Sequence, residues 1–351
     1  MSYTIKSKKI GVFSDIHIGL GQDSSTWHDI VLDFAKWASK VYTEAGINDI
    51  IIPGDIFHNR SEISVNTLAT AKAFFDILKD FRILISAGNH DCYYKDRSDV
   101  NSISLFEGWQ NIIIVDKAPM IIQAGDKSIS LIPWGVPVDD IPKSDICFGH
   151  FEIQTFYMNT FKLCDHGFDS TNLLKKSPLV ISGHFHSKDD RVYKNGRIVY
   201  VGSPYQQNFG DVDQTRGIYI LDIESEKLDF FENKTSPKHI KIYVSKLRNK
   251  KQDADFLKEN IPNNMVSLII DEELNNEKIT LLSAKLQNLN PKFFRIDYKS
   301  INNDLLENSS TVDYNMIDIE KNIEDFVNSL DVQHKEDVIS YLTEKYKEIA
   351  L

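Results

Sequence analysis

Cysteine is scarce in this chain, and long apolar runs are missing. The three cysteines, Cys92, Cys147 and Cys164, form an odd, unpatterned set without a CxxC pair. Such a set argues against a disulfide framework or a thiolate zinc site and fits a reducing compartment. No stretch approaches the roughly 20 apolar residues of a membrane span, and Met1–Phe13 lacks the apolar core of a signal peptide. We therefore expect a soluble intracellular protein in which Cys147 is a small core residue.

Basic residues are outnumbered, which at first sight disfavours a nucleic-acid partner. The 351 residues carry 40 Lys and Arg against 51 Asp and Glu, a formal net charge of −11. The distribution matters more than the sum. Residues 299–351 hold 5 basic and 12 acidic side chains, which leaves a net of only −4 on the first 298 residues. Bound divalent metals would make the active face of this nearly neutral body more positive.

Most of the chain repeats a short apolar run followed by a polar cluster. Five runs show little alternation, as buried strands do: Ile10–Ser14, Asp49–Pro53, Ile83–Ala87, Asp145–Gly149 and Leu179–Gly183. Helical spacing of apolar residues appears between the first three runs, at Asp29–Ala45 and Val65–Asp80. The pattern is α/β, and it places each polar cluster at the carboxyl end of a strand, where such sheets bind ligands.

The following region is richer in strands and leads into a second, smaller unit. Three more strands are expected at Ile129–Pro133, Arg197–Val201 and Gly217–Ile223. The second unit has a β-α-β-α-β pattern, with expected elements at His239–Val244, Asp253–Glu259, Met265–Asp271, Asn276–Leu289 and Lys292–Tyr298. We therefore expect a large domain over residues 1–236 and a small capping domain over residues 237–298.

The C-terminal region consists of a polar stretch and two amphipathic segments. Residues 299–312 are rich in Asn, Ser and Asp and read as a linker. Within residues 313–351, apolar residues recur at helical spacing in two sets: Ile319, Ile323, Phe326, Val327 and Leu330, then Val338, Ile339, Leu342, Tyr346 and Ile349. Two amphipathic helices without a domain of their own favour docking on a partner. The alternative is a hairpin that folds back on the body of this chain.

Five clusters hold the side chains that point to chemistry. They are Asp15-Ile16-His17, Gly54-Asp55, Gly88-Asn89-His90-Asp91, Gly149-His150 and Gly183-His184-Phe185-His186. Each alone is weak, because a Gly-Asp pair is usually a turn and a single histidine is usually a hydrogen-bonded structural residue. Together they hold or adjoin six of the ten histidines and place them at the ends of five expected strands. This concentration favours a metal site.

The spacing within the clusters suits metal binding. In Asp-x-His and His-x-His the two ligands share one side of an extended segment, because side chains alternate along a strand. Glycines beside the ligands let the backbone turn sharply and approach the site closely. Mixed nitrogen and oxygen ligands without thiolates suit Mn²⁺, Fe²⁺ or Zn²⁺. An aspartate that bridges two ions is the economical arrangement for seven ligands.

In order and spacing, the clusters resemble the motifs of the calcineurin-like metallophosphoesterase superfamily. Supporting residues are Gly54-Asp55-Ile56-Phe57-His58, Gly88-Asn89-His90-Asp91, Ile132-Pro133-Trp134, Gly183-His184-Phe185-His186, Gly202-Ser203-Pro204 and Arg216-Gly217. Within the superfamily the chain resembles the meiotic-recombination-11 (SbcD) nuclease family, and in size and detail its T-even phage members. The resemblance covers the whole chain. It implies a four-layer α/β/β/α sandwich with a small α+β capping domain and a C-terminal helical docking element.

The resemblance also implies a role for each residue of the site. Seven ligands would serve two metals: Asp15, His17 and His186 for one, Asn89, His150 and His184 for the other, and Asp55 as the bridge. His90 would lie near the scissile phosphate as transition-state stabiliser or leaving-group acid, oriented by Asp91. His58 would help to position DNA for exonucleolytic cleavage, although an ordinary loop histidine is the alternative.

The function implied by the resemblance is that of a nuclease subunit in DNA double-strand-break repair and recombination. Such a subunit hydrolyses DNA phosphodiesters as an exonuclease and endonuclease with two divalent ions, Mn²⁺ being expected before Mg²⁺. The implied partners are DNA, an SbcC-type (radiation-sensitive-50-like) ABC ATPase whose coiled coil receives the tail helices, and a second copy, giving a 2:2 heterotetramer. The expected location is the cytoplasm, of a bacterial host if the gene is a phage gene, without membrane contact.

Residues that contact DNA are less well marked than the metal ligands. Charged or stacking candidates near the clusters are Arg60, Tyr93, Tyr94, Lys95, Arg97 and Lys188. Tyr205-Gln206-Gln207-Asn208 is a further polar segment with the composition of a loop that touches a phosphate backbone. Each residue singly is more typical of a solvated surface.

Two other functions fit the same clusters. A small-molecule or nucleotide metallophosphodiesterase would need the same ligands, although a bare body without a capping domain suffices for small substrates. A non-catalytic scaffold on this fold is the second alternative, but it would be expected to have lost ligands, and all seven are present. The protein Ser/Thr phosphatases are disfavoured because their Tyr-Val-Asp-Arg-Gly and Gly-Asn-His-Glu motifs are absent.

Overall fold

A six-stranded sheet carries three of the five clusters. The structure, a computed structural model, describes residues 3–158, 162–299, 327 and 334–349. Along this sheet the strands follow the order β13-β12-β2-β3-β4-β5. Their bounds are Lys227–Glu232, Gly217–Asp222, Lys9–Val12, Asp49–Pro53, Arg82–Ser86 and Ile112–Val115. β2 to β5 are parallel, while β12 runs antiparallel to β2, so the carboxyl ends of β2, β3 and β4 meet at one edge.

A seven-stranded sheet carries the other two clusters. Its order is β1-β6-β7-β8-β9-β11-β10. The strands span Tyr3–Ile5, Met120–Ala124, Lys127–Ile132, Ile146–His150, Leu179–Gly183, Gly196–Tyr200 and Asp189–Tyr193. β7, β8, β9 and β11 are mutually parallel. β6 forms an antiparallel hairpin with β7 and β10 one with β11, and β1 adds to β6 in parallel. His150 is the last residue of β8 and His184 directly follows β9, so both stand at carboxyl ends.

The side chains of the central strands alternate between a core on the outer face of each sheet and a core between the two sheets. On β4, Ile83 and Ile85 pack in the core beneath the helices, whereas Leu84 packs in the core between the sheets. On β8, Phe148 faces the core between the sheets, and Cys147 lies in the core on the outer face, as predicted. This alternation follows from the period of two along a strand. The central strands of both sheets, such as β4 and β8, are therefore buried on both faces.

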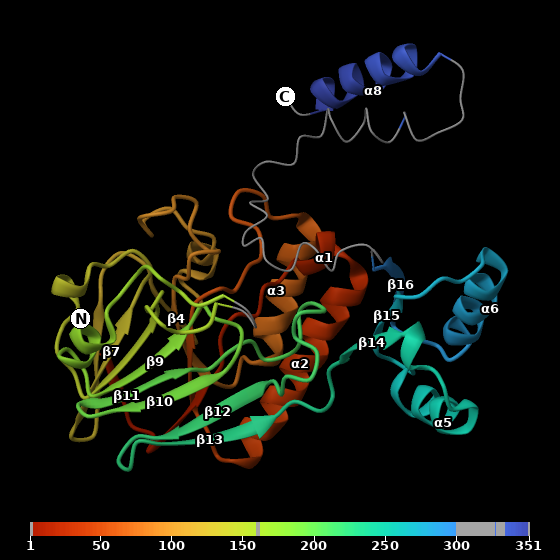
Figure 1. Cartoon of the computed structure of the whole chain (residues 1–351). Coiled ribbons are helices and arrows are strands. Elements are labelled where there is room, and N and C mark those ends of the chain that lie inside the picture. Colours follow the sequence, from red (N-terminus) through yellow and green to blue (C-terminus); the bar gives the residue numbers. More distant parts are fainter. Residues whose placement is uncertain (1–2, 159–161, 300–326, 328–333, 350–351) are drawn as a thin grey trace. The chain divides into compact units, whose positions relative to one another are not determined.

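Helices cover the outer face of the six-stranded sheet, and loops largely cover that of the seven-stranded sheet. Helices α2 (Ser25–Glu44) and α3 (Val65–Ile77) lie together on the first face (Figure 1). Ser64 caps α3 by accepting a hydrogen bond from the N–H of Thr67. The second face carries only the short helix α4 (Ser170–Leu174) and loop residues such as Phe156. The predicted four-layer order is present, with a thin fourth layer.

Three short helical turns complete the two-sheet body. They are α1 (Leu20–Asp23), η1 (Ile103–Phe106) and η2 (Val138–Asp140).

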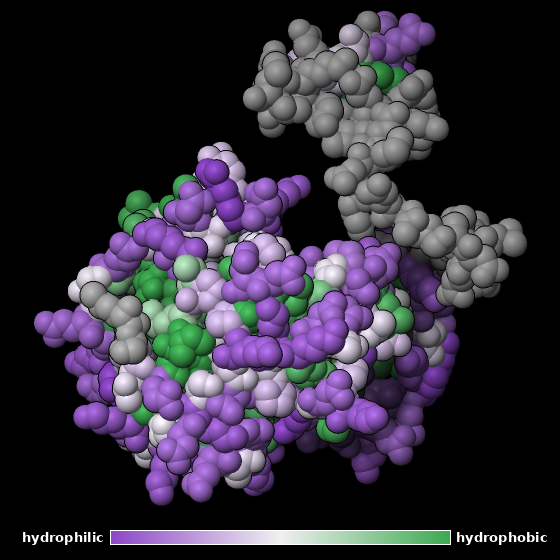
Figure 2. All heavy atoms as spheres, turned by 90° about the vertical axis from the view of Figure 1, so that its left-hand side faces the viewer, coloured by the Kyte–Doolittle hydropathy of each residue, from purple (hydrophilic) through white to green (hydrophobic). Residues whose placement is uncertain are grey.

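The surface of the body is mostly hydrophilic on the face that Figure 2 shows. Hydrophobic side chains on that face form small separate groups among hydrophilic ones (Figure 2). Among the described residues, no helix is long and apolar enough to cross a membrane.

The second unit of the sequence pattern forms a small parallel sheet with its own core. Strands β14 (His239–Tyr243), β15 (Met265–Ile270) and β16 (Phe293–Tyr298) pair in that order, with helices α5 (Lys250–Asn260) and α6 (Asn276–Gln287) as crossovers and η3 (Val244–Lys246) after β14. Asn249 and Asn275 cap the two helices. We call residues 237–298 the cap. Met265 at the start of β15 packs in the core beneath α2 and α3, so the cap contacts the body.

Residues 300–351, the tail, are assigned to a different unit from residues 1–299. Helix α8 spans Lys335–Ile349 and contains the second predicted amphipathic set. The first predicted set, Ile319–Leu330, and the predicted linker after residue 299 lie outside the described residues, apart from the buried Val327. The docking role of the tail therefore stays a prediction.

Replacing Leu84 by alanine tests the core between the sheets. Leu84 is 0% exposed, and removing a buried leucine side chain costs about 2–5 kcal/mol of unfolding free energy. Leu105, which is 54% exposed, supplies the control, since an exposed site changes stability by about 0.5 kcal/mol or less. Urea unfolding of both alanine variants measures the difference, and equal costs would contradict the layer assignment.

Candidate metal centre

The backbone of the first cluster adopts a conformation that side chains disfavour. Asp15 and His17 have φ values of 57° and 53°, in the left-handed region. Asp55 and His184 share this feature, with φ values of 55° and 91°. For a residue other than glycine this costs about 1–3 kcal/mol and persists only where the surroundings impose it. Four such residues in one site indicate a geometry selected for function.

Hydrogen bonds between the first two clusters impose this conformation. The N–H groups of Asp15, Ile16 and His17 donate to the carbonyl oxygens of Gly54, Asp55 and again Asp55, at 3.3, 2.9 and 3.2 Å. The segment after β2 is therefore hydrogen-bonded along its length to the segment after β3. This pairing brings the side chains of Asp15, His17 and Asp55 to one place.

Close backbone approach at glycines joins the two sheets at this edge. A Cβ atom on Gly183, at the end of β9, would lie 2.6 Å from the carbonyl oxygen of Pro53 and 2.9 Å from Nδ1 of His150. Gly54 has φ 98°, and a Cβ there would lie 2.7 Å from Cα of Gly88. Any larger residue at these positions would separate the strand ends that carry the clusters.

One group of predicted ligands gathers around His17. The Nε2 atoms of His17 and His186 lie 3.1 Å apart, and Nε2 of His186 lies 4.0 Å from Oδ1 of Asp15. Asp15 also accepts the backbone N–H of His184 at 3.1 and 3.2 Å with its two oxygens. Burial lowers the pKa of His17, and it lowers the pKa of His186 to about 4. Both imidazoles are therefore neutral near pH 7, with lone pairs available to a cation.

A second group gathers around Asn89. Its Oδ1 lies 2.9 Å from Nε2 of His150 and 2.9 Å from Nδ1 of His184, and these two nitrogens are 3.2 Å apart. Nδ1 of His150 donates to the carbonyl oxygen of Pro53 at 2.8 Å, so Nε2 is the ring nitrogen that faces Asn89. Nε2 of His184 faces Oε1 of Glu152 at 3.2 Å, so Nδ1 of that ring faces Asn89. The two rings therefore direct one nitrogen each at the same point.

Asp55 stands between the two groups. Its Oδ2 lies 3.5 Å from Nε2 of His17 and 3.3 Å from Nε2 of His150, and its Oδ1 accepts the backbone N–H of His90 at 2.8 Å. Burial opposes ionisation of Asp55, but the charge and hydrogen bond of His150 hold its pKa well below the usual range. In turn, burial lowers the pKa of His150, yet Asp55 outweighs this and raises it to about 9.

The donor set fits two divalent cations. Six nitrogen and oxygen donors converge around Asp55 with side chains that are largely buried: Asp15, His17, Asn89, His150, His184 and His186. The two carboxylates of Asp15 and Asp55, buried in one place, are costly unless positive charge compensates them. The structure thus brings together all seven predicted ligands, in the predicted two groups, while their coordination of metal stays a prediction.

The two further predicted histidines lie beside the first group. The ring centroids of His90 and His58 lie 4.7 and 5.5 Å from that of His17, and the two rings stack on each other at 5.8 Å. Nδ1 of His90 donates to the carbonyl oxygen of His58 at 2.6 Å, which leaves Nε2 facing away from that bond. Trp134 takes the corresponding place beside the second group, 5.4 Å from the ring of His184.

Asp91 does not orient the ring of His90, contrary to prediction. Its carboxylate accepts four backbone N–H groups at 2.9–3.1 Å, those of Asp55, Ile56, Phe57 and Gly88. Burial and the charge of Asp55 raise the pKa of Asp91 to about 7, whereas the four donors favour the ionised form. Asp91 instead holds the two loops that carry Asp55 and Asn89. Asp91 does not contact the ring of His90 because its side chain is buried beneath the loops, whereas the ring of His90 lies beside His17 and His58.

Several residues of the site escaped the sequence analysis. Glu152, two positions after His150, orients His184 as described. Tyr205 donates to the carbonyl oxygen of Ile16, and Gln207 donates from Nε2 to that of Asp15 at 2.7 Å. The expectation that residues 205–208 touch a phosphate backbone is wrong for Tyr205, Gln206 and Gln207, which are 1%, 7% and 6% exposed. Their polar composition reflects partners inside the protein.

The charged and aromatic DNA candidates lie largely at the surface. Tyr93 and Tyr94 are 55% and 40% exposed, and the guanidinium of Arg97 lies 4.0 Å above the ring of Tyr94. Lys95 and Lys188 are exposed and Arg60 is partly exposed. Tyr93 to Arg97 follow Asp91 after the buried Cys92, so this exposed segment begins at the edge of the metal centre.

The comparisons with known proteins now assign the class. The description "Calcineurin-like phosphoesterase" matches residues 8–260, well over half of the 351 residues. The chain therefore belongs to the calcineurin-like phosphoesterase family, as the resemblance predicted. It is a phosphoester hydrolase whose fold brings together candidate ligands for divalent metals.

The chain is also similar to a phage protein. Over 240 residues the chain is 31% identical to "Exonuclease subunit 1" of Enterobacteria phage T4, which covers 65% of this chain and 68% of that protein. Among solved structures, a dimetal phosphatase from Danio rerio aligns with a TM-score of 0.40 and 11% identity, over 64% of this chain and 95% of that one. The second similarity is too low to carry an argument.

Replacing Asp91 by asparagine tests its role as a clamp between loops. An amide cannot serve four N–H donors as a carboxylate does, so we expect a loss of about 1.5–3 kcal/mol of unfolding free energy and weaker metal binding. The exposed Asp126 in the turn after β6 gives the matched control, Asp126→Asn. Urea unfolding and Mn²⁺ titration calorimetry measure both effects. A cost like that of the control would contradict the clamp.

Proposed function

We propose that the chain is a metal-dependent DNA nuclease that hydrolyses phosphodiester bonds. The observation that carries this proposal is the pair of ligand groups joined by Asp55, with His90 and His58 beside one of them. The two ligand groups alone would serve the hydrolysis of any phosphate ester. The added histidines and the 31% identity to a phage exonuclease subunit favour DNA over a small-molecule substrate.

The side chains divide the chemical work among them. Two divalent cations, when bound, would supply positive charge to the phosphate and make a water nucleophilic near neutral pH. Asp55, whose Oδ1 accepts the N–H of His90, keeps the two ligand groups at a fixed distance from each other. His90, with Nδ1 committed to the carbonyl oxygen of His58, presents Nε2, which when protonated can donate to a phosphate oxygen or protonate the leaving 3′-oxygen.

Affinity for DNA would come from the segment after Asp91 and from the ions. Tyr93 and Tyr94 offer rings on which bases stack, and Lys95 and Arg97 offer charges to phosphates. Such contacts carry no sequence readout. The proposal is therefore a nuclease that acts on DNA structure, such as ends, and not on a particular sequence.

The proposal extends to partners and metal, for which the resemblance is the support. We propose that Mn²⁺ is the preferred ion, that two copies associate, and that the amphipathic residues of α8, such as Val338, Ile339 and Leu342, dock on the coiled coil of an SbcC-type ATPase. The acidity of residues 299–351 keeps this segment away from DNA and suits a partner protein. Such a complex would act in double-strand-break repair and recombination, in the cytoplasm of a bacterial host.

Cleavage of end-labelled duplex DNA by the full chain tests the proposal. With Mn²⁺ and the ATPase partner we expect cleavage, and His90→Ala should lower its rate by about 10²–10⁴-fold with metal binding retained. The matched control is His28→Gln. His28 on α2 pairs with Asp23 on α1 at 2.7 Å and is not among the predicted metal ligands. Intact DNA beside rapid hydrolysis of a cyclic nucleotide would favour the small-molecule alternative and sink the nuclease.

A further inference from the structure

Two adjacent glutamines, Gln206 and Gln207, are buried in the loop that leads from β11 to β12. They are 7% and 6% exposed. A buried amide costs free energy unless it is hydrogen-bonded, so the partners of these side chains account for their presence. The two side chains bond in different directions, one to the metal-ligand segment and the other to the cap.

Gln207 bonds to the segment that carries two predicted ligands. Its Nε2 donates to the carbonyl oxygen of Asp15 at 2.7 Å, and the neighbouring Tyr205 donates to that of Ile16. The N–H groups of this segment are already bonded to Gly54 and Asp55. The two side chains therefore fix the opposite side of a backbone whose left-handed residues, Asp15 and His17, need to be held. The acceptor is a carbonyl, so Nε2 must be the atom that faces it.

Gln206 bonds to the first residue of β14, the first strand of the cap. Its Oε1 accepts the backbone N–H of His239 at 2.6 Å, and its Nε2 donates to the carbonyl oxygen of Gln214 at 3.0 Å. Around this bond, the ring of Phe209 packs edge-on against His239 at 4.8 Å and lies 4.2 Å from the guanidinium of Arg295 on β16. The loop thus contacts both the first and last strands of the cap.

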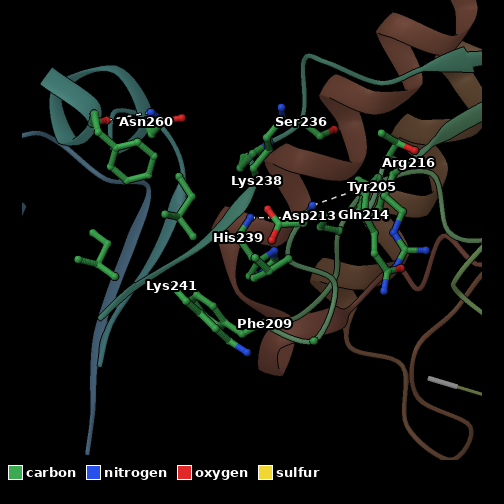
Figure 3. A pocket seen from close by; sticks show the side chains of 18 of the residues that line it. Tyr205, Phe209, Asp213, Gln214, Arg216, Ser236, Lys238, His239, Lys241 and Asn260 are labelled. Carbon is green, nitrogen blue, oxygen red and sulfur yellow. Dashed lines mark hydrogen bonds between the residues drawn. The ribbon is translucent and has the colours of Figure 1, made fainter. Parts of the chain in front are cut away.

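A cavity of about 1020 Å³ lies at the joint between cap and body. Its lining includes Tyr205, Phe209 and Arg216 of the loop, Asn233, and cap residues such as His239 and Asn260. Tyr205, Phe209 and His239 stand around it in Figure 3. Gln206 and His239 both line this space, so the bond between them connects cap and body there, in addition to the packing of Met265.

A buried ion pair makes the loop stiff. The carboxylate of Asp211 accepts the backbone N–H of Gln207 at 2.8 Å and of Asn208 at 3.3 Å, and pairs with the guanidinium of Arg216 at 2.7 Å. Asp211 and Arg216 are 6% and 4% exposed. A movement of Gln206 is therefore passed to Gln207 with little loss.

We propose that Gln207 is a positioning residue for Asp15 and His17, and that Gln206 ties it to the cap, so that the seating of the cap sets the geometry of one metal-ligand group. The inference needs the metal centre but not DNA as the substrate. It predicts that metal affinity depends on two side chains that are not ligands, and on the joint with the cap.

Metal-binding calorimetry of the full chain tests the first half. Gln207→Met keeps the volume and loses only the hydrogen bond, so we expect the Mn²⁺ dissociation constant of one site to rise about 10–100-fold, as for other residues that orient ligands. Gln207→Glu should be worse, because a carboxylate would face the carbonyl oxygen of Asp15. Asn208→Ala, in the same loop but exposed, should bind as wild type does. Unchanged binding by Gln207→Met would overturn the proposal.

A second variant and a second readout test the link to the cap. Gln206→Met should weaken Mn²⁺ binding by a smaller factor, and the double variant should weaken it by less than the product of the two factors, because the residues act in one chain of contacts. Wild-type binding by Gln206→Met would overturn the link. Excess Mn²⁺ should restore hydrolysis of bis-(p-nitrophenyl) phosphate by Gln207→Met, whereas an unfolded variant would stay inactive at any Mn²⁺ concentration. Thermal unfolding of the metal-free variant in EDTA shows separately whether it is folded. This substrate keeps the result independent of DNA cleavage, so a failed nuclease and a failed positioning role are distinguishable.

Discussion

The convergence of buried polar side chains on Asp55 is the constraint on which the rest of this structure depends. Nε2 of His17 and Nε2 of His186 lie 3.1 Å apart, next to the carboxylates of Asp15 and Asp55, which are 0% and 1% exposed. Burying two carboxylates in one place is costly unless positive charge compensates them and the backbone holds them in place. Divalent ions are expected to supply the first, and the loops supply the second.

The supporting loops show how the protein holds this cluster. Asp91 gathers four N–H groups from the loops after β3 and β4, while Gln207 and Tyr205 hold the loop after β2 from its other side. Gly183 lets β9 of the second sheet reach the same point. The fold thus provides strand ends from two sheets, and buried polar side chains convert these ends into a defined geometry.

Much of this arrangement was predictable from the sequence, because it follows from local patterns. Apolar runs such as Asp49–Pro53 and Leu179–Gly183 are strands with the predicted bounds, since a strand buried on both faces leaves a continuous apolar signal. The positions of the seven candidate metal ligands were predictable because each lies within three residues of the end of such a run. Short strands with mixed burial, such as Asp189–Tyr193, leave no comparable signal and were missed.

Other features depend on direction, which one sequence does not encode locally. Asp91 adjoins His90 in the chain but its side chain turns toward the backbone of Asp55. Gln206 and Gln207 have the composition of a surface loop, yet their partners lie 33 and 192 positions away. Glu152 is visible as a carboxylate two residues after His150, and only the fold shows that it orients His184. Contacts between distant segments decide these roles.

The central claim is that seven side chains form a two-metal centre bridged by Asp55, and anomalous diffraction from Mn²⁺-soaked crystals tests it most directly. The account predicts two anomalous peaks per chain, about 3.5–4 Å apart as in other two-metal sites. One peak should lie among Asp15, His17 and His186, the other among Asn89, His150 and His184, and Asp55 should contact both. A single peak, or peaks remote from Asp55, would contradict the account.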